Sequence, residues 1–341
     1  AQQTGALPAP VFPAGTFGEL PIPFVSRAGY GANLPELQQA AASGGHFNPL
    51  VDFDGSSRRV PLVVKFDGRY YEALSVAVLR MALGNASLKA GIPQGESLIE
   101  WLEVSSERGE LRIPVDENVA ALVPYRGREH SFPYVSAVDV IKGQISPDQL
   151  KGRIVLVGTT APGLMDLRST PVGAAYPGVE VHANLIAGML SGTVKEKPGY
   201  VLAIEVLQIL LFGGMLVSLL PLLSPLRATL LTLATMGLTL GISIWFWSSA
   251  NLVLPLASSV LLVLLLYAFN MSWGYFVESR TKRQFAELFG QYVPPELVDE
   301  MARNPESYSM EGRNEELTVF FADIRNFTSL SEGMDPRELT R

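Results

Sequence analysis

Two long stretches of the chain carry no charged residue, and their hydrophobic pattern predicts helices that cross a membrane. Asp, Glu, Lys, Arg and His are all absent from residues 206–226 and 228–277. A helix needs about 20 consecutive apolar residues to span a bilayer. Pro221 and the uncharged SSAN turn divide the region into three such helices, over about 201–220, 227–247 and 252–273. This pattern indicates an integral membrane protein and excludes a purely cytosolic enzyme.

Basic residues around these helices predict their orientation. Arg227 lies between the first two helices, and Arg280, Lys282 and Arg283 follow the third. Basic loops stay on the cytoplasmic side, so residues 1–199 are expected outside and the C-terminus inside. Trp245 and Trp247 at the outer boundary agree with an aromatic belt. We therefore expect a multi-pass protein of the inner (plasma) membrane, in contact with lipid.

Two features inside the predicted helices each allow two interpretations. Glu205 could pair with a partner helix, as intramembrane carboxylates often do, or reach water at headgroup depth. Gly237 and Gly241 have the G-x-x-x-G spacing that lets helix backbones approach closely, although this spacing also arises by chance in apolar segments. The glycine spacing favours helix packing over a transport path.

Strand-like and helix-like patterns alternate through residues 1–199 and predict an α/β domain with mixed strand pairing. After about 25 residues rich in Pro and Gly, the alternating VPLVVKF segment reaches a hairpin turn at Asp67-Gly68. The continuous apolar run RIVLVG, residues 153–158, is typical of a strand covered on both faces. Further elements are expected as helices at 33–42, 74–83 and 178–192, and as strands around the turn at 107–109 and over 119–125.

The loop after RIVLVG is the predicted ligand-binding region of this domain, since ligands of open α/β sheets bind at the carboxyl ends of strands. Its polar candidates are Thr159, Thr160, Asp166 and Arg168. The alternative is that Asp166 and Arg168 pair only to order the loop, while the threonines cap turns. His182, which precedes an apolar helix face, is predicted to be a packed histidine rather than a ligand.

Composition and charge narrow the chemistry further. The 341 residues suffice for two domains, with 48% hydrophobic and 17% charged residues. The absence of Cys excludes a disulfide framework, a thiolate nucleophile and a Cys-based zinc site. The three histidines are far apart along the chain, which argues against a His-rich metal centre. A net charge of −7 without a long basic block argues against nucleic acid as a partner.

Three segments, in order, resemble the cyclase/histidine-kinase-associated sensory extracellular domain of the second type. They are HFNPLVDFDGSSRRVPLVV (His46–Val64), GRIVLVGTTAPGLMDLRSTP (Gly152–Pro171) and PGVEVHANLIAGML (Pro177–Leu190). The resemblance implies a sensor of an unknown extracytoplasmic signal, with one membrane helix before it and three after it. We expect that first helix and the first part of the sensor to precede Ala1. Ligands of the family are mostly undefined, so no binding residue is carried over.

Residues 277–312 are predicted to form a helical connector. Phe285, Leu288, Phe289 and Tyr292 share one helical face before Pro294-Pro295. This face could pair with its copy in a dimer or pack on its own domain.

The C-terminal segment ELTVFFADIRNFTSLSEGMDPRELTR predicts a buried strand with Asp323 at its end and a helix opening near Thr328. A carboxylate at a strand end, beside free helix N–H groups, can hold a divalent cation against polyphosphate oxygens, although many such aspartates only form turns. FFADIRNFTSLSE resembles the opening of class III nucleotidyl cyclase catalytic domains. FGQYVPPELVDEM, just upstream, resembles the segment that precedes that domain.

This second resemblance implies that residues 313–341 begin an α+β, ferredoxin-like cyclase domain. By it, Asp323 and the carbonyl of Ile324 bind two divalent cations, Mg²⁺ or Mn²⁺, and Asn326, Phe327 and Thr328 lie against the triphosphate. Asn326 stands where the family usually has Gly. The second metal-binding aspartate would lie beyond Arg341, so residues 1–341 alone are not expected to be catalytic.

The expected whole is therefore a homodimeric receptor adenylate cyclase that converts ATP to cyclic AMP and pyrophosphate. Its parts are a sensor (1–199), three membrane helices (200–276), the connector (277–312) and the cyclase start. One alternative is a sensor histidine kinase with the same outer domain, but residues 277–341 contain no phosphoacceptor His. The other is a non-enzymatic membrane receptor.

Overall fold

The computed structural model describes residues 2–18, 20–107, 109–160, 163–164, 166–289, 316, 318–323, 325–326 and 332, with α7 side chains described as far as Val277. The chain divides into two compact units, Ala1–Met271 and Ser272–Arg341. The first unit contains an α/β domain followed by the membrane-type helices.

Five small sheets, four α-helices and one 3₁₀ turn build the described part of the α/β domain. The pairs β1–β3 and β2–β6 are parallel and the other described pairs are antiparallel, which confirms mixed pairing. The strands are β1 (Gln3–Thr4), β2 (Val25–Ser26), β3 (Tyr30–Gly31), β4 (Leu50–Val51), β5 (Ser57–Pro61), β6 (Val63–Phe66), β7 (Arg69–Glu72), β8 (Ser87–Gly91), β9 (Trp101–Ser106), β10 (Gly109–Pro114), β11 (Ala120–Leu122), β12 (Leu167–Thr170) and β13 (Gly173–Pro177). The helices are α1 (Pro35–Ala40), α2 (Leu74–Ala82), α3 (Ala137–Ile141), the 3₁₀ turn η1 (Pro147–Gln149) and α4 (Gly178–Ser191).

The predicted hairpin is confirmed, with one change. Asp67 and Gly68 have φ values of 49° and 72°, which is the backbone of a tight type I′ connection between β6 and β7. The alternating segment at 60–66 is not one strand, because β5 ends at Pro61 and β6 begins at Val63. The two strands join different sheets.

One hydrophobic core joins these sheets to α2 and α4, which contact each other. Its fully buried side chains include Leu62, Leu79, Leu102, Ile113 and Leu185. The Pro-rich N-terminal segment was predicted to be a loop, yet it contributes Phe12, Phe17 and Phe24 to this core. The rings of Phe17 and Phe24 pack on Tyr70 with centroid separations of 4.9 and 4.7 Å, and Phe12 packs on Phe17 at 5.2 Å, so this segment is anchored by aromatic packing.

The predicted strand over residues 153–158 is wrong. These residues are extended without strand pairing, and Ile154, Val155 and Val157 are 43%, 53% and 88% exposed. A strand forms only beside another strand that accepts its backbone hydrogen bonds, and no described strand lies beside this run. The sheet edge at which the ligand loop was expected is therefore not formed by the described residues.

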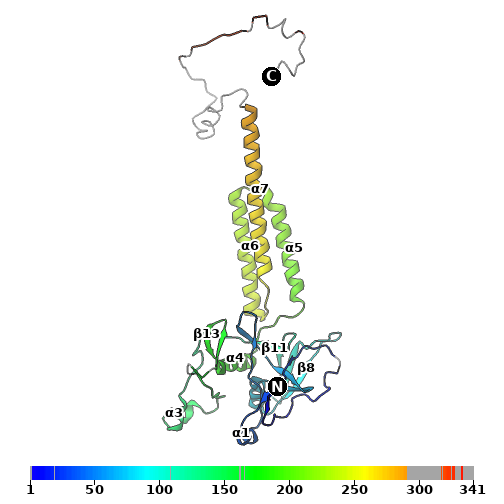
Figure 1. Ribbon diagram of the computed structural model, residues 1–341, viewed down its shortest axis with the longest axis vertical. Coiled ribbons are helices and arrows are strands. Elements are labelled where there is room, and N and C mark those ends of the chain that lie inside the picture. Colours follow the sequence, from blue (N-terminus) through cyan, green and yellow to red (C-terminus); the bar gives the residue numbers. More distant parts are fainter. Residues whose placement is uncertain are drawn as a thin grey trace. The chain divides into compact units, whose positions relative to one another are not determined.

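Three helices that are long and apolar enough to cross a membrane follow the α/β domain, as predicted. They are α5 (Val201–Leu219, extended by the 3₁₀ turn η2, Leu220–Leu222), α6 (Pro225–Trp245, extended by the π-helical turn η3, Phe246–Ala250) and α7 (Ala257–Phe289). Figure 1 shows the three running side by side. α7 begins later than expected, because Leu252 forms a β-bridge with Glu196.

α7 also continues without a break past residue 277, where a boundary between membrane helix and connector was predicted. The predicted connector helix is thus an extension of the third membrane helix, at least as far as Phe289. The side chains of Phe285, Leu288 and Phe289, like the whole of Tyr292, lie outside the described part of the structure, so the role of that apolar face stays a prediction.

Packing among the three helices leaves one face of α6 open. Thr232, Thr235 and Thr239 are buried on the inner face, and each hydroxyl donates a hydrogen bond to a carbonyl one turn earlier. Gly237 and Gly241 lie opposite, where an added Cβ would meet nothing within 4 Å. The glycine spacing is therefore not used for packing among the described residues.

Glu205 has a partner within the chain. Its carboxylate accepts a hydrogen bond from the hydroxyl of Ser258, which ties α5 to α7. A second polar contact joins α6 to α7, between Thr229 Oγ1 and Tyr267 Oη at 2.8 Å. These contacts support the helix-packing interpretation of Glu205.

Candidate functional site

Asp166 and Arg168 of the predicted ligand loop lie together at the start of α4. Their side chains approach to 3.6 Å, and the carbonyl of Asp166 accepts a 2.8 Å hydrogen bond from the N–H of Gly178. A Cβ at Gly178 would collide with the Asp166 carboxylate. Thr159 and Thr160 are exposed, and no hydrogen bond within the described part of the loop joins them to this pair. Direct contacts thus support the interpretation that Asp166 and Arg168 order the loop. Ligand contact by the residues of this loop stays a prediction.

The charged residues of the HFNPLVDFDGSSRRVPLVV segment pair with one another. Arg58 contacts Asp52 at 2.8 Å and Asp54 at 2.6 Å. Arg59 contacts Asp52 at 2.5 Å and Asp116, next to β11, at 2.8 Å. These ion pairs connect the β4–β5 turn to the segment that precedes β11, so the paired residues have a structural role.

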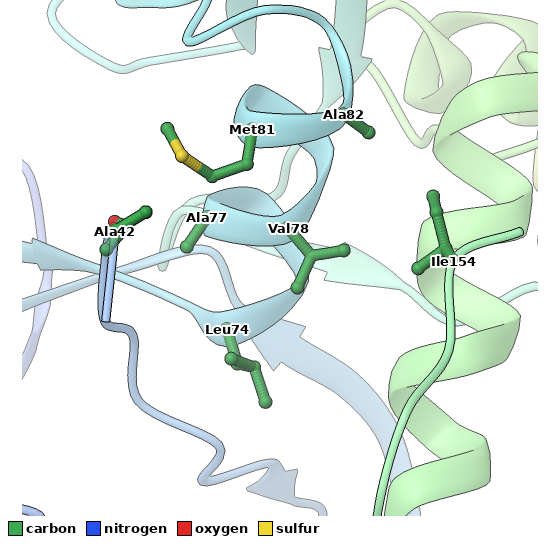
Figure 2. Close-up of a pocket in the computed structure, with 8 residues that line it drawn as sticks. Ala42, Leu74, Ala77, Val78, Met81, Ala82 and Ile154 are labelled. Carbon is green, nitrogen blue, oxygen red and sulfur yellow. The ribbon is translucent and has the colours of Figure 1, made fainter. Parts of the chain in front are cut away.

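An apolar cleft lies along the exposed face of α2. It encloses about 380 Å³ and is lined by Ala42, Ser43, Leu74, Ala77, Val78, Met81, Ala82 and Ile154. Figure 2 shows the α2 side chains between Ala42 and Ile154, the latter from the unpaired 153–158 segment. The volume is at the lower end for small-molecule pockets. Its lining carries no charged side chain, so the cleft suits an apolar group rather than a charged metabolite.

Glu180 on α4 is a buried carboxylate with four hydrogen-bond donors. They are the backbone N–H groups of His130 and Ser131, at 3.1 and 2.8 Å, and the hydroxyls of Ser131 and Tyr134, at 2.7 and 2.6 Å. Burial acts to raise the pKa of Glu180, but these hydrogen bonds outweigh it and hold the pKa below its ordinary value. Glu180 therefore anchors the 130–134 loop to α4. Sequence reasoning missed this role, because its partners lie about 50 residues away.

His46 and His182, which are distant in the sequence, lie near each other: Nε2 of His182 is 3.4 Å from the carbonyl oxygen of Phe47, the residue after His46. Burial is the main cause that lowers the pKa of His46, to about 4, and the neighbouring His182 adds to it. Within the part of the chain that the structure describes, neither ring nitrogen of His46 has a hydrogen-bond partner, nor has Nδ1 of His182. His182 is packed, as predicted, but only its Nε2 approaches an acceptor, the carbonyl of Phe47 at 3.4 Å. No three His, Cys, Asp or Glu side chains of the described chain are placed to hold a metal ion together.

The segment that follows α4 is bonded to the loop between α6 and α7. Lys195 Nζ donates to the carbonyl of Trp247 at 2.5 Å and to Asn251 Oδ1 at 2.7 Å. Asn251 Nδ2 in turn donates to the carbonyl of Gly192 at 3.1 Å. The N–H of Glu196 donates a 2.9 Å hydrogen bond to the carbonyl of Asn251. The carbonyl of Glu196 accepts a 2.9 Å hydrogen bond from the N–H of Val253. We call these contacts the α4–hairpin junction.

Comparison with protein families identifies the N-terminal unit. A family model described as the CHASE2 domain matches residues 7–220, which include the α/β domain and α5. The chain belongs to the CHASE2 family. CHASE2 is a sensor domain found in receptor cyclases and kinases, so the resemblance of the three sensor segments is confirmed. No curated protein and no solved structure matches the chain.

The residues predicted to bind metal and nucleotide phosphate lie outside the CHASE2 match, and the structure describes only some of them. Asp323 is exposed at the end of the extended residues 318–323. Asn326 has a φ of 61°, in the left-handed region that Asn tolerates better than most residues. Ile324, Phe327 and Thr328 lie outside the described residues, so their phosphate- and metal-binding roles remain predictions.

The predicted buried strand LTVFFA is not present in the described residues of this segment. Residues 318–323 have no strand pairing, and Val319, Phe320 and Phe321 are 68%, 86% and 90% exposed. The physical reason is the one that applies to residues 153–158. A buried strand requires neighbouring strands, and no described strand pairs with this segment.

Proposed function

We propose that this CHASE2 protein is a receptor adenylate cyclase, in which an outer sensor controls the conversion of ATP to cyclic AMP and pyrophosphate. One observation carries the proposal: the cyclase-like segment FFADIRNFTSLSE follows a CHASE2 domain and three membrane-type helices in the same chain. The continuous α7 supports it, because a helix that leaves the membrane unbroken can pass a change to the segment that follows.

Asp323 is the residue of this chain that fits a metal-dependent reaction best. Its carboxylate is exposed, and carboxylate oxygen is the ligand that Mg²⁺ and Mn²⁺ prefer. When bound, two such cations would neutralise phosphate charge and activate the ribose 3′-hydroxyl. The chain would hold them with Asp323 and the carbonyl of Ile324, and would orient the triphosphate with the N–H groups of Asn326, Phe327 and Thr328.

The direct test is nucleotide turnover by the full-length protein in membranes. With ATP and Mg²⁺ or Mn²⁺ we expect cyclic AMP and an equal amount of pyrophosphate, and GTP in parallel measures base selection. Phosphorylated protein without cyclic nucleotide would instead support the kinase alternative. If ATP yields neither product, the protein is better described as a non-enzymatic receptor.

We expect residues 1–199 to face the outside, because the basic residues that flank the helices are placed for a cytoplasmic C-terminus. The cysteine-free chain allows a direct measurement with single cysteines and a membrane-impermeant thiol reagent on intact cells. Ser146→Cys, at an exposed position of the α/β domain, should be labelled, and Ser307→Cys should be labelled only after lysis. The reverse pattern would contradict the orientation.

The proposed homodimer should depend on the open face of α6. Gly237→Leu together with Gly241→Leu adds bulk where the described helices leave space, so folding should persist while association of the membrane part weakens. Cross-linking yield and mass in detergent solution measure this. Leu207→Ala with Leu211→Ala, on exposed positions of α5, is the control for a general loss of apolar surface. Unchanged association in the glycine variant would remove this face from the dimer.

A further inference from the structure

The His46–His182 pair has no evident structural benefit in its neutral form. Buried polar groups in folded proteins are almost always hydrogen-bonded, and each exception calls for an explanation. Here three of four imidazole nitrogens are buried without a hydrogen-bond partner among the described residues. The fourth, His182 Nε2, has only a long contact of 3.4 Å to Phe47.

The backbone around His46 is held in place independently of its ring. The N–H of His46 donates a 3.0 Å hydrogen bond to the backbone carbonyl of Glu72, and the carbonyl of His46 accepts a 2.7 Å hydrogen bond from the N–H of Leu74. The preceding Gly45 lies so close to α2 that an added Cβ would be 2.5 Å from the N–H nitrogen of Leu74. The backbone that carries the ring of His46 is therefore fixed beside α2, and both ring nitrogens are buried.

Burial is the main factor that opposes protonation of both imidazoles. For His46, burial comes first, then His182 and Arg27, while the carbonyl of Pro61 favours the proton without reaching hydrogen-bonding geometry. For His182, burial again comes first. The carbonyl of Phe47 and the carboxylate of Asp166 favour its proton, and Arg168 opposes it.

α4 connects this pair to the membrane helices. His182 lies in the first turns of α4, which continues without a break to Ser191 and ends at Gly192, in the left-handed conformation. The carbonyl of Gly192 is part of the α4–hairpin junction. A displacement of α4 at His182 would therefore change the hydrogen bonds of the loop that precedes α7.

We propose that the His46–His182 pair is an acid-operated latch. Uptake of a solvent proton by either imidazole separates His46 and Phe47 from α4, and α4 passes this release through the α4–hairpin junction to the loop before α7. The signal would be external acidity, so this inference rests on the outward orientation in the proposed function.

The sign and size of the response follow from proton linkage. The released state binds protons near the ordinary histidine value of 6.5, whereas the latched His46 has a pKa of about 4. Release is therefore disfavoured above pH 6.5 and grows as pH falls from 6.5 toward 4. For His46 alone, the ratio of released to latched protein rises about 30-fold between pH 8 and pH 5.

The test uses full-length protein in nanodiscs and hydrogen exchange corrected for the intrinsic effect of pH. Between pH 8 and pH 5, exchange should accelerate by about 30-fold in α4, and it should also accelerate in the 248–256 loop. His46→Gln and His182→Gln should remove this acceleration. His130→Gln should retain it, because His130 is exposed and stacks on Tyr134. Equal exchange at both pH values in the parent, or an acceleration that survives both latch variants, would overturn the latch.

Two further measurements keep the proposal testable if a latch variant fails to fold. In the parent protein, imidazole NMR should show two histidines, His46 and His182, that titrate below the ordinary histidine value of 6.5, and titration of both at that value would overturn the latch. Asn251→Ala should keep the acid response in α4 but lose it in the 248–256 loop, and a retained loop response would overturn the proposed route. None of these readouts involves nucleotide turnover, so a failed latch and a failed cyclase proposal are distinguishable.

Discussion

Asp323→Asn should lower cyclic-nucleotide formation by the full-length protein by at least about 100-fold, with unchanged expression and dimer mass. A divalent cation contributes several kcal/mol of charge stabilisation in a phosphoryl-transfer transition state, and each 1.4 kcal/mol is tenfold in rate. Asn keeps the shape and the turn-forming hydrogen bonds of Asp but lacks the negative charge that a cation requires. A purely structural Asp323 would therefore tolerate this change.

Asp335→Asn is the matched control, since Asp335 lies 12 residues further along, before Pro336 and outside the cyclase-like motif. It should leave turnover within a few-fold of the parent. The decisive measurement is turnover at saturating Mg²⁺ or Mn²⁺, so that weakened metal affinity is not mistaken for loss of the site. Near-parental activity of Asp323→Asn would exclude Asp323 as a metal ligand and remove most of the support for a cyclase.

Arg80→Ala should destabilise the α/β domain by about 3–5 kcal/mol, because it leaves a buried carboxylate without its counter-charge. Glu72 has a side chain only 6% exposed and contacts Arg80 at 2.7 Å, while its other oxygen has no hydrogen-bond partner. Arg80 also donates a 2.7 Å hydrogen bond to the carbonyl of Ala86. Denaturant unfolding of the full chain, followed by a probe in the α/β domain, measures the loss.

Lys89→Ala is the control for this prediction. Lys89 and Glu103 also form an ion pair, but at 3.8 Å and with the lysine side chain 64% exposed, so its loss should cost under about 1 kcal/mol. A pH series adds a second check. Burial raises the pKa of Glu72 even beside Arg80, so the Arg80→Ala deficit should shrink as acid neutralises the carboxylate. Equal losses in the two variants would show that the buried pair has no special role.

The sequence by itself determined the elements whose signals are local. Two charge-free apolar stretches, divided by Pro221 and the SSAN turn, predicted three membrane-type helices, because span length depends only on consecutive residues. Asp67-Gly68 predicted its hairpin because few residues adopt positive φ at both turn positions. The sensor segments likewise sufficed to indicate the family of the N-terminal unit.

Strand formation was beyond the reach of local pattern. RIVLVG and LTVFFA both have the composition of covered strands, yet neither has a strand beside it among the described residues. Composition reports that a segment would be stable once paired, but pairing depends on residues elsewhere in the chain. For the same reason the N-terminal loop was not expected to bring three phenylalanines to Tyr70.

Only the tertiary structure decided which polar groups meet. His182 lies 135 residues from Phe47, and Lys195 lies 56 residues from Asn251, yet each pair is in contact. No periodicity links such positions, because their proximity results from the packing of α4 against the core and from the hydrogen bonds of the junction. The burial that shifts the histidine pKa values arises from the same packing, since a side chain loses its water only when distant segments cover it.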